Sequence, residues 1–411
     1  MSVDNRAFVA KYSRLLRKKL ASKLIVDFLA RRSVALFPAT RRLFHLYLKT
    51  ASPNEVPHRR LDPGGLITVS APIDARMEAH LRSFERYGRG LGDRVQPGRL
   101  ELSIDLKLYE LQDCDLLPWL GLTVHRPCGL VLDGGLDAQP RLVSRKRPVP
   151  GLVISLVDTP RGHNHYFHFF ERLTLVMRAL KWVGPETPLT LLVRDSLSSY
   201  QKAAIGALAA RRPGLRVQAV ANYEIVQPER LLLLRRAPCP MICWFTLAEE
   251  WAEIGRMIRE DYGPPPPGPT DRRLHLSRRQ QKLRRVVNED ALEPVFAKHG
   301  FELVLPDTLS HVQQVHLIAQ ARVIAAAEGA AMTSLMFAER PVRMIMMAAR
   351  DTINPFWEAL AIFLGHEFIY VEGGHAQWYD AFKVEPAALD AALSEPLPEA
   401  APEVTLGAAA I

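Results

Sequence analysis

Short apolar segments alternate with helix-like segments from residue 151 to residue 347, and one proline-rich run interrupts them. That run is Gly263-Pro264-Pro265-Pro266-Pro267-Gly268-Pro269. Strands that alternate with helices predict a parallel sheet with crossover connections. Four consecutive prolines fit neither a helix nor the interior of a sheet, so the run predicts a stiff connector. We therefore expect an α/β chain with two αβ units, the second having the content of a small Rossmann-like domain.

The proline-rich run and the changes in sequence pattern divide the chain into four segments. Residues 1–60 form a basic helical segment, and 61–262 form an N-terminal domain with a β-rich extension. Residues 270–395 form a C-terminal domain, and 396–411 form a flexible tail rich in Ala, Pro and Glu. In the extension, Leu66–Val69 reads as a strand, and a second strand alternates Leu102, Ile104, Leu106 and Leu108 with polar residues before Pro148 and Pro150 close the stretch. The other expected strands are 152–157, 189–193, 217–220, 231–234, 274–276, 302–305, 322–326 and 343–347, and the expected helices are 165–182, 199–211, 289–299, 310–319 and 331–337.

Positive charge is concentrated at the N-terminus. Residues 1–60 have a net charge of +11, against +9 for the whole chain, so the remainder is slightly acidic. This distribution argues against a nucleic-acid-binding body and favours a local contact with an anionic surface. An apolar residue recurs every fourth position in the expected helix over residues 7–32. That helix could lie on a membrane surface or pack on the body of the protein, and both readings stay open.

The cysteine content and the hydropathy pattern indicate in which cellular compartment we expect the protein. The chain has four cysteines, too few and too scattered for a disulfide framework. Cys239 and Cys243 have no second pair at metal-ligand spacing, so zinc is not expected. The sequence has no apolar run of membrane-spanning length and no secretory signal pattern. We expect a cytoplasmic protein, with peripheral contact at the inner face of the membrane through residues 7–32 as an option.

The first candidate for a functional site follows the strand Leu274–Leu276. This strand delivers Ser277 and Arg278 to its carboxyl end, where ligands bind in open α/β sheets. Arginine makes bidentate, charge-assisted bonds to phosphate. Five basic residues cluster here, namely Arg278, Arg279, Lys282, Arg284 and Arg285. This cluster predicts that a diphosphate can be neutralised without a metal, although a solvated basic turn would look the same.

The second candidate is the small-residue turn Glu328-Gly329-Ala330-Ala331-Met332-Thr333, after the apolar strand 322–326. Small residues let a ligand approach the backbone, and the N–H groups of a helix N-terminus attract an anion. Turns of this kind are also common in strand-to-helix connections that bind nothing.

The third candidate is the aromatic segment from Asn164 to Leu173. His168 and Glu171 are three residues apart, which places them on one face of a helix. Either could act as general base toward an acceptor hydroxyl. A histidine among aromatic residues is also common as a hydrogen-bonded core residue. Asp113-Cys114-Asp115 matches a metal-phosphate pattern, but no αβ unit follows it directly.

Together these segments resemble glycosyltransferase family 61, in its bacterial capsular-polysaccharide branch. The resemblance covers residues 150–392. Its elements, in order, are the segment from Asn164 to Leu173, Ser277-Arg278 with Arg284, Arg285, Asn288 and Glu289, Leu309-Ser310 with Gln313-Gln314, the turn from Ala326 to Ser334, and Asn354-Pro355-Phe356-Trp357 with Leu360-Ala361 and Leu364-Gly365-His366.

The resemblance implies two Rossmann-like domains in a GT-B-like arrangement. It implies inverting transfer from a nucleotide sugar to a glycan or glycolipid acceptor in capsular or cell-surface polysaccharide synthesis, with no obligatory metal or other cofactor. The expected catalytic residues are His168, Glu171 and Glu328. The expected donor-binding residues are Ser277, Arg278, Arg284, Arg285, Gly329, Ala330 and Thr333.

One departure from the family pattern falls inside the site. The position that the family fills with His is Glu328 here. A carboxylate would repel a phosphate, so Glu328 has to face sugar hydroxyls, be protonated, or mark lost activity. A catalytically inactive nucleotide-sugar or glycan-binding protein is therefore the alternative function, and a metal-dependent transferase using Asp113 and Asp115 is a third.

Overall fold

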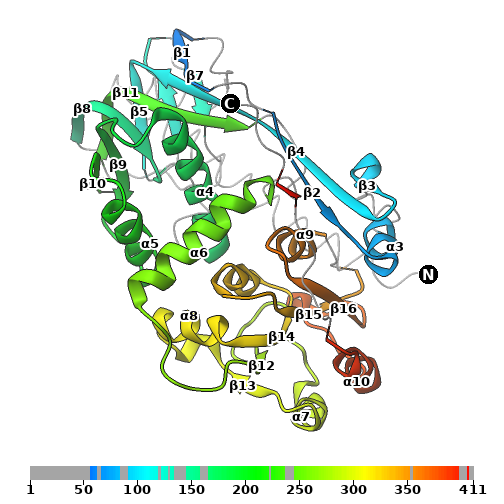
Figure 1. The fold of residues 1–411 in the computed structure, drawn as a ribbon. Coiled ribbons are helices and arrows are strands. Elements are labelled where there is room, and N and C mark those ends of the chain that lie inside the picture. Colours follow the sequence, from blue (N-terminus) through cyan, green and yellow to red (C-terminus); the bar gives the residue numbers. More distant parts are fainter. Residues whose placement is uncertain are drawn as a thin grey trace.

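The computed structural model contains two sheets, each covered by helices (Figure 1). The structure describes residues 56–62, 66–83, 91–118, 122–127, 130–133, 145–157, 165–221, 224–236, 245–351, 355–397 and 405–406. The expected helix 7–32, Asn164, Cys239, Cys243 and Asn354 lie outside these residues.

The C-terminal sheet is a five-stranded parallel sheet in the order β13-β12-β14-β15-β16. The strand that comes first along the chain is second in space, so the sheet is built outward in both directions, as in doubly wound folds. The point where the order reverses lies between β12 and β14. The strands are β12 (Arg272–Leu276), β13 (Glu302–Val304), β14 (Ala321–Ala327), β15 (Arg343–Ala349) and β16 (Glu367–Gly373).

Helices cover both faces of this sheet because successive residues of each strand point to opposite sides. Ile324 and Ala326 pack with the apolar residues of α8 (His311–Ala319), the 3-10 helix η7 (Ala330–Phe337) and α9 (Phe356–Phe363). Val323 and Ala325 pack with α7 (Glu289–Lys298) and α10 (Pro386–Ser394). A strand that is buried on both faces needs a continuous apolar sequence, and β14 and β15 have one.

The N-terminal sheet combines a parallel part with an antiparallel part. Its main path is β10-β9-β8-β11-β4-β2-β17, parallel from β10 to β11 and antiparallel from β11 onward. The parallel order corresponds to half of a Rossmann sheet. The strands are β1 (His58–Arg60), β2 (Leu66–Pro72), β3 (Val95–Gln96), β4 (Arg99–Leu111), β5 (Cys114–Leu117), β6 (Leu122–His125), β7 (Leu130–Asp133), β8 (Arg145–Ser155), β9 (Leu189–Arg194), β10 (Leu215–Val220), β11 (Glu224–Arg236) and β17 (Thr405–Leu406).

Helices α4 (Tyr166–Val183), α5 (Ser199–Ala210) and α6 (Ala248–Tyr262) lie between the two sheets or beside the first. An aromatic cluster joins the two αβ units here: Phe167 of α4 stacks on Trp251 of α6 and meets Phe356 of α9 edge-on. At Gly255 of α6 the carbonyl of Met336 lies where a Cβ would be, so only glycine allows α6 to approach η7 this closely.

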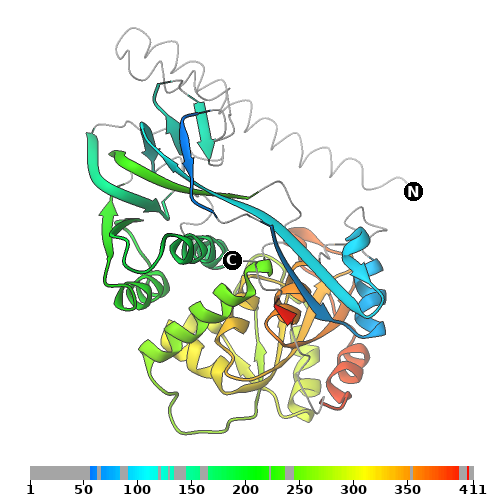
Figure 2. The same cartoon turned by 45° about the horizontal axis from the view of Figure 1, so that its top comes forward.

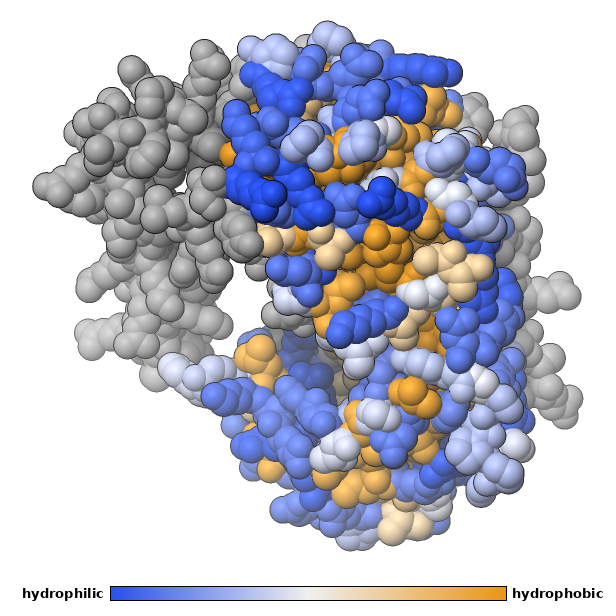
Figure 3. Space-filling view, turned by 90° about the vertical axis from the view of Figure 1, so that its left-hand side faces the viewer, coloured by the Kyte–Doolittle hydropathy of each residue, from blue (hydrophilic) through white to orange (hydrophobic). Residues whose placement is uncertain are grey.

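The antiparallel extension also contacts the second unit. Strands β2 and β4 extend beyond the parallel part of their sheet to the side of the C-terminal sheet (Figure 2). Helix α3 (Ala75–Ser83), which follows β2 along the chain, lies there as well. Arg76 of α3 pairs with Glu395 at 2.6 Å, and His80 pairs with the fully buried Glu358 of α9 at 3.0 Å. The side of the molecule that shows α5 and α8 has a mostly hydrophilic upper end, hydrophobic side chains across its middle, and a mixture of both at its lower end (Figure 3).

The mixed α/β class with a mostly parallel sheet agrees with the sequence prediction, and three details differ. Residues 331–337 form a 3-10 helix instead of an α-helix. Pro148 and Pro150, expected to close the β-rich stretch, lie inside β8. Strand β9 pairs with β8 only from Val153 onward, so the N–H groups that the two prolines lack cost no hydrogen bond to β9. Thr405–Leu406 of the expected flexible tail pairs with β2. Among the described helices, none is both long and apolar enough to cross a membrane.

Buried histidines predict that the fold loses stability in acid. Burial lowers the pKa of His366 and His311 to about 4 and that of His275 to about 3, against about 6.5 in an unfolded chain. Between these values the unfolded state binds more protons than the native state, so the free energy of unfolding decreases as the pH falls from about 6.5 to about 4. Urea unfolding at about pH 7 and about pH 5 would measure this slope. In His366→Gln the slope should be smaller, and a slope of zero in the parent protein would contradict the prediction.

Candidate active site at the switch point of the C-terminal sheet

The site lies where the strand order of the C-terminal sheet reverses. Connections leave β12 and β14 on opposite faces of the sheet, which opens a crevice at the carboxyl ends of these two neighbouring strands. Ser277 follows β12, and Glu328 follows β14. Residues 51 positions apart in sequence are thus brought to one edge by the sheet alone.

Ser277 and Arg278 are held by a tight turn. The Ser277 N–H donates to Val304 O at 2.9 Å, and the Ser277 Oγ accepts from the Arg279 N–H at 3.2 Å. The Arg278 Nη2 donates to Leu283 O at 3.1 Å, and its Nε is buried with no hydrogen-bond partner among the described residues. The serine therefore fixes the turn that aims the arginine.

The Arg278 guanidinium packs directly against the backbone of Gly329. A Cβ at position 329 would lie 2.9 Å from Arg278 Cζ and would overlap Nη1. Because the backbone at Gly329 is extended, the requirement for glycine comes from this contact and not from φ. Ala330 begins η7, and Thr333 is fully buried in it, with an Oγ1 that has no hydrogen-bond partner in the described part of the chain.

Arg284 pairs with Glu328. Its Nη1 lies 3.4 Å from Glu328 Oε1, and the carboxylate is buried. Arg284 adopts φ 55°, an unusual value for a side-chain-bearing residue, and this directs it toward the site. The buried carboxylate of Glu328 therefore has a cationic partner in this structure.

The two guanidinium groups affect each other. Burial lowers the pKa of Arg278, and the positive charge of Arg284 lowers it further. Like charges held in a partly buried place favour an anionic ligand, because the ligand removes their repulsion.

Arg279, from the same basic cluster, has other partners. Arg279 pairs with Glu293 of α7 at 2.6 Å, so the anion-binding role expected for it is not supported by its position. Arg285 is exposed, and its carbonyl accepts from the Phe382 N–H. Asn288 of the same motif makes two hydrogen bonds with the backbone of Val384, which is a structural role.

His168 and Glu171 come from the other αβ unit. The His168 Nδ1 lies 3.1 Å from Glu171 Oε2, on the first turns of α4. With Nδ1–H donating to the carboxylate, Nε2 is the nitrogen that carries the lone pair. The ring of His165, just before the helix, lies beside that of His168, with the ring centroids 4.6 Å apart. Partial desolvation lowers the pKa of His165, and the charges of His168 and Arg284 lower it further.

Sequence reasoning missed a hydrogen-bonded group that holds α4 in place. His311 of α8 accepts or donates at both ring nitrogens, to Tyr166 OH at 3.0 Å and to Tyr262 OH at 2.8 Å. Burial keeps this histidine neutral near pH 7 and raises the pKa of Tyr166. The bonds tie α4 and α6 to α8. The aromatic run 166–170 was visible in the sequence, but nothing in it indicated a partner 145 residues away.

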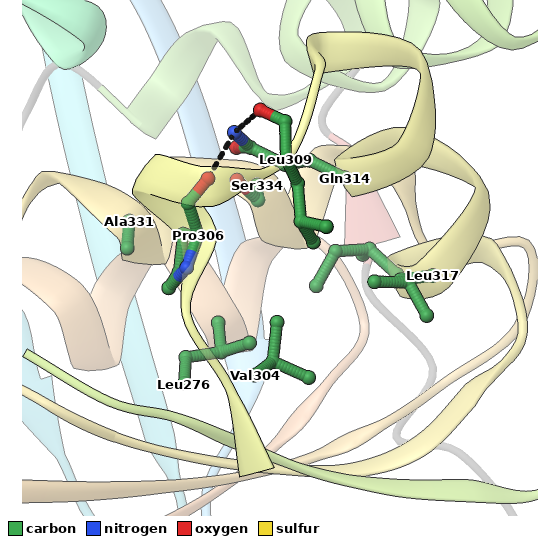
Figure 4. Close-up of a pocket in the computed structure, with 9 residues that line it drawn as sticks. Leu276, Val304, Pro306, Leu309, Gln314, Leu317, Ala331 and Ser334 are labelled. Atoms are coloured by element: carbon green, nitrogen blue, oxygen red, sulfur yellow. Dashed lines mark hydrogen bonds between the residues drawn. The ribbon is translucent and has the colours of Figure 1, made fainter. Parts of the chain in front are cut away.

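A small cavity lies behind the crevice. Leu276, Val304, Leu309 and Ala331 supply part of a largely apolar wall around a volume of about 20 Å³. The side chain of Gln314 also lines the cavity, and its Nε2 donates to Pro306 O at 2.9 Å and to Leu309 O at 3.2 Å (Figure 4). The volume suits about one water molecule, so it is a packing void and not a ligand pocket.

Asp113 and Asp115 both form ion pairs with Arg126. Arg126 lies 2.8 Å from Asp113 and 3.3 Å from Asp115. One guanidinium thus bridges the two carboxylates, and the Gln227 side chain also donates to Asp115 Oδ1, at 2.9 Å. In the described residues no group of His, Cys, Asp and Glu is arranged to hold a metal.

The switch point thus offers two half-buried arginines, Gly329 packed against one of them, and the buried carboxylate of Glu328, while the His168–Glu171 pair lies on the other αβ unit. That arrangement is typical of enzymes that handle nucleotide-linked substrates. The family model of Glycosyltransferase 61 matches residues 136–345, and the chain belongs to this family. Membership implies sugar transfer between a donor and an acceptor. A search of curated proteins found no match.

Proposed function

We propose that the protein is an inverting, metal-independent glycosyltransferase that moves a sugar from a nucleotide-sugar donor to a glycan acceptor. Its role in cell-surface polysaccharide synthesis, which the resemblance implies, belongs to the same proposal. The observation that carries it is the meeting of Arg278, Arg284 and Gly329 at the switch point of a doubly wound sheet.

In this mechanism Arg278 and Arg284 bind the donor diphosphate, and backbone N–H groups at Gly329 and Ala330 assist. Negative charge grows on the diphosphate as the glycosidic bond breaks, so fixed cations stabilise the transition state more than the ground state. His168, oriented by Glu171, removes the proton from the acceptor hydroxyl, and that oxygen attacks the anomeric carbon from the face opposite the diphosphate. Glu328 holds Arg284 and accepts hydrogen bonds from donor hydroxyls.

The test is a thermal-shift panel with UDP, GDP, CMP and dTDP, each with and without chelator. A ligand that binds the native state raises the melting temperature, so one nucleotide should shift it and the chelator should leave the shift unchanged.

Two glycine variants make this panel specific to the site. Gly329→Ala should lose the nucleotide shift because its methyl group displaces the Arg278 guanidinium. Gly206→Ala, on α5, meets nothing within 4 Å and should keep it. No shift with any nucleotide would contradict the proposal. A shift without sugar transfer or donor hydrolysis would favour the inactive binding protein.

A further inference from the structure

Two exposed aromatic side chains stand beside the switch point. Trp378 is 78% exposed and Tyr379 is 55% exposed, the highest values among the described aromatic residues. Their rings meet edge-on, with centroids 5.5 Å apart. They form the tip of residues 374–383, here called the aromatic loop, which leaves the carboxyl end of β16. The loop therefore emerges at the same edge of the sheet as Ser277 and Glu328.

The base of the aromatic loop is firmly anchored. Phe382 is buried and pairs with Val286 in an isolated parallel bridge. The Phe382 N–H donates to Arg285 O at 3.0 Å, and the Gly374 N–H donates to Lys383 O at 2.8 Å. At Gly373 a Cβ would lie 2.8 Å from Lys383 O, so the two ends of the loop are packed together. The exposure of its tip is thus a property of a rigid loop.

Backbone strain is concentrated at this corner. Four described residues other than glycine have a positive φ, and three of them are Arg284, Tyr379 and Asp380. Strain of this kind persists where function requires a particular side-chain direction. The Arg284 N–H donates to Tyr379 O at 3.0 Å, while the Arg284 side chain pairs with Glu328. One residue therefore links the aromatic tip to the buried carboxylate of the site.

We propose that Trp378 and Tyr379 form the acceptor subsite, a platform on which a sugar ring of the glycan acceptor stacks. This inference rests on the proposed function. The C–H groups on one face of a pyranose are attracted by the negative face of an aromatic ring, and its hydroxyls remain at the rim. Polar partners stand nearby, namely Asp380 and His375, with His375 3.7 Å from Asp351.

The charges around the platform favour a glycan over a membrane. A loop that inserts into an anionic lipid surface is expected to carry basic residues beside its aromatic ones. At the tip the charged neighbour is Asp380, next to Tyr379, which such a surface would repel, and Asp351 lies beside His375 and Ala376. The basic residues Lys383 and Arg285 lie at the base of the loop. Hydroxyl groups, in contrast, are good donors to carboxylates.

The experiment uses a glycan array that carries neutral, N-acetylated and acidic oligosaccharides, probed with the full chain. Trp378→Ala should bind its glycan about tenfold more weakly, since loss of one stacking partner costs up to that much. Leu303→Ala is the matched control, because Leu303 is an exposed apolar residue on β13, the opposite edge strand. It should bind as the parent protein does.

Two further measurements separate the explanations. The nucleotide shift should survive in Trp378→Ala, which shows that the variant is folded and that its donor site is intact. If no glycan signal depends on Trp378, the subsite is wrong, and a retained nucleotide shift would leave the proposed function standing. If Trp378→Ala instead loses binding to phosphatidylserine vesicles and keeps glycan binding, the loop is a membrane contact and the proposal fails. A Trp378-dependent glycan signal without any nucleotide shift would contradict the donor assignment only.

Discussion

Arg278→Ala is expected to lower kcat for sugar transfer by about 10²–10³, the loss typical of removing one preorganised group that stabilises charge in a transition state. Its guanidinium is fixed against Gly329 and is held near the positive charge of Arg284. That repulsion exists in the empty protein and is relieved as the leaving diphosphate gains charge. The arginine therefore acts more strongly on the transition state than on the bound substrate. The measurement is initial-rate kinetics with the donor that the nucleotide panel identifies.

Arg279→Ala is the matched control. It removes the same side chain one position along the chain, but this arginine pairs with Glu293 on α7 and points away from the switch point. We expect its kcat to stay within about threefold of the parent value, because neither of its partners, Glu289 and Glu293, belongs to the candidate site. Equal losses in the two variants would mean that general positive charge matters and that the geometry at Gly329 does not. Near-normal turnover in Arg278→Ala would remove this residue from the mechanism.

The sequence was sufficient for the parts of the fold that depend on local pattern. Apolar runs such as 322–326 and 343–347 are continuous because both faces of their strands are buried, and they could be recognised without any structure. The meeting of Ser277 with Glu328 was also within reach, since both follow parallel strands and such strands end at one edge.

Contacts between distant residues could not be predicted in this way. The bond from Tyr166 to His311 and the bond from Arg284 to Tyr379 depend on how crossovers and loops fold back on the sheet. Membership in a motif also does not assign a role. His366 bonds Leu335 O and has its pKa lowered by burial, so it stabilises the packing of η7 and lies outside the candidate site. A motif of this kind records which residues a fold needs, and the structure is required to separate packing from chemistry.

His168→Gln is expected to lower kcat by about 10²–10⁴, the usual contribution of a general base, while the nucleotide shift remains. Glu171→Gln should lose less, because its amide oxygen can still accept from His168 Nδ1–H and keep the ring oriented. Initial-rate kinetics with the donor that the nucleotide panel identifies would measure both losses.

The order of the rate losses distinguishes the two residues that the sequence left as alternatives. If Glu171 were the base, Glu171→Gln would abolish turnover, and His168→Gln would be the milder variant. His58→Gln serves as the control, since His58 is exposed on β1 and bonds only locally to Val56 O. Its rate should match that of the parent protein. The order of losses, with His168 first and Glu171 second, follows from a geometry in which the carboxylate aims the imidazole and the imidazole takes the proton.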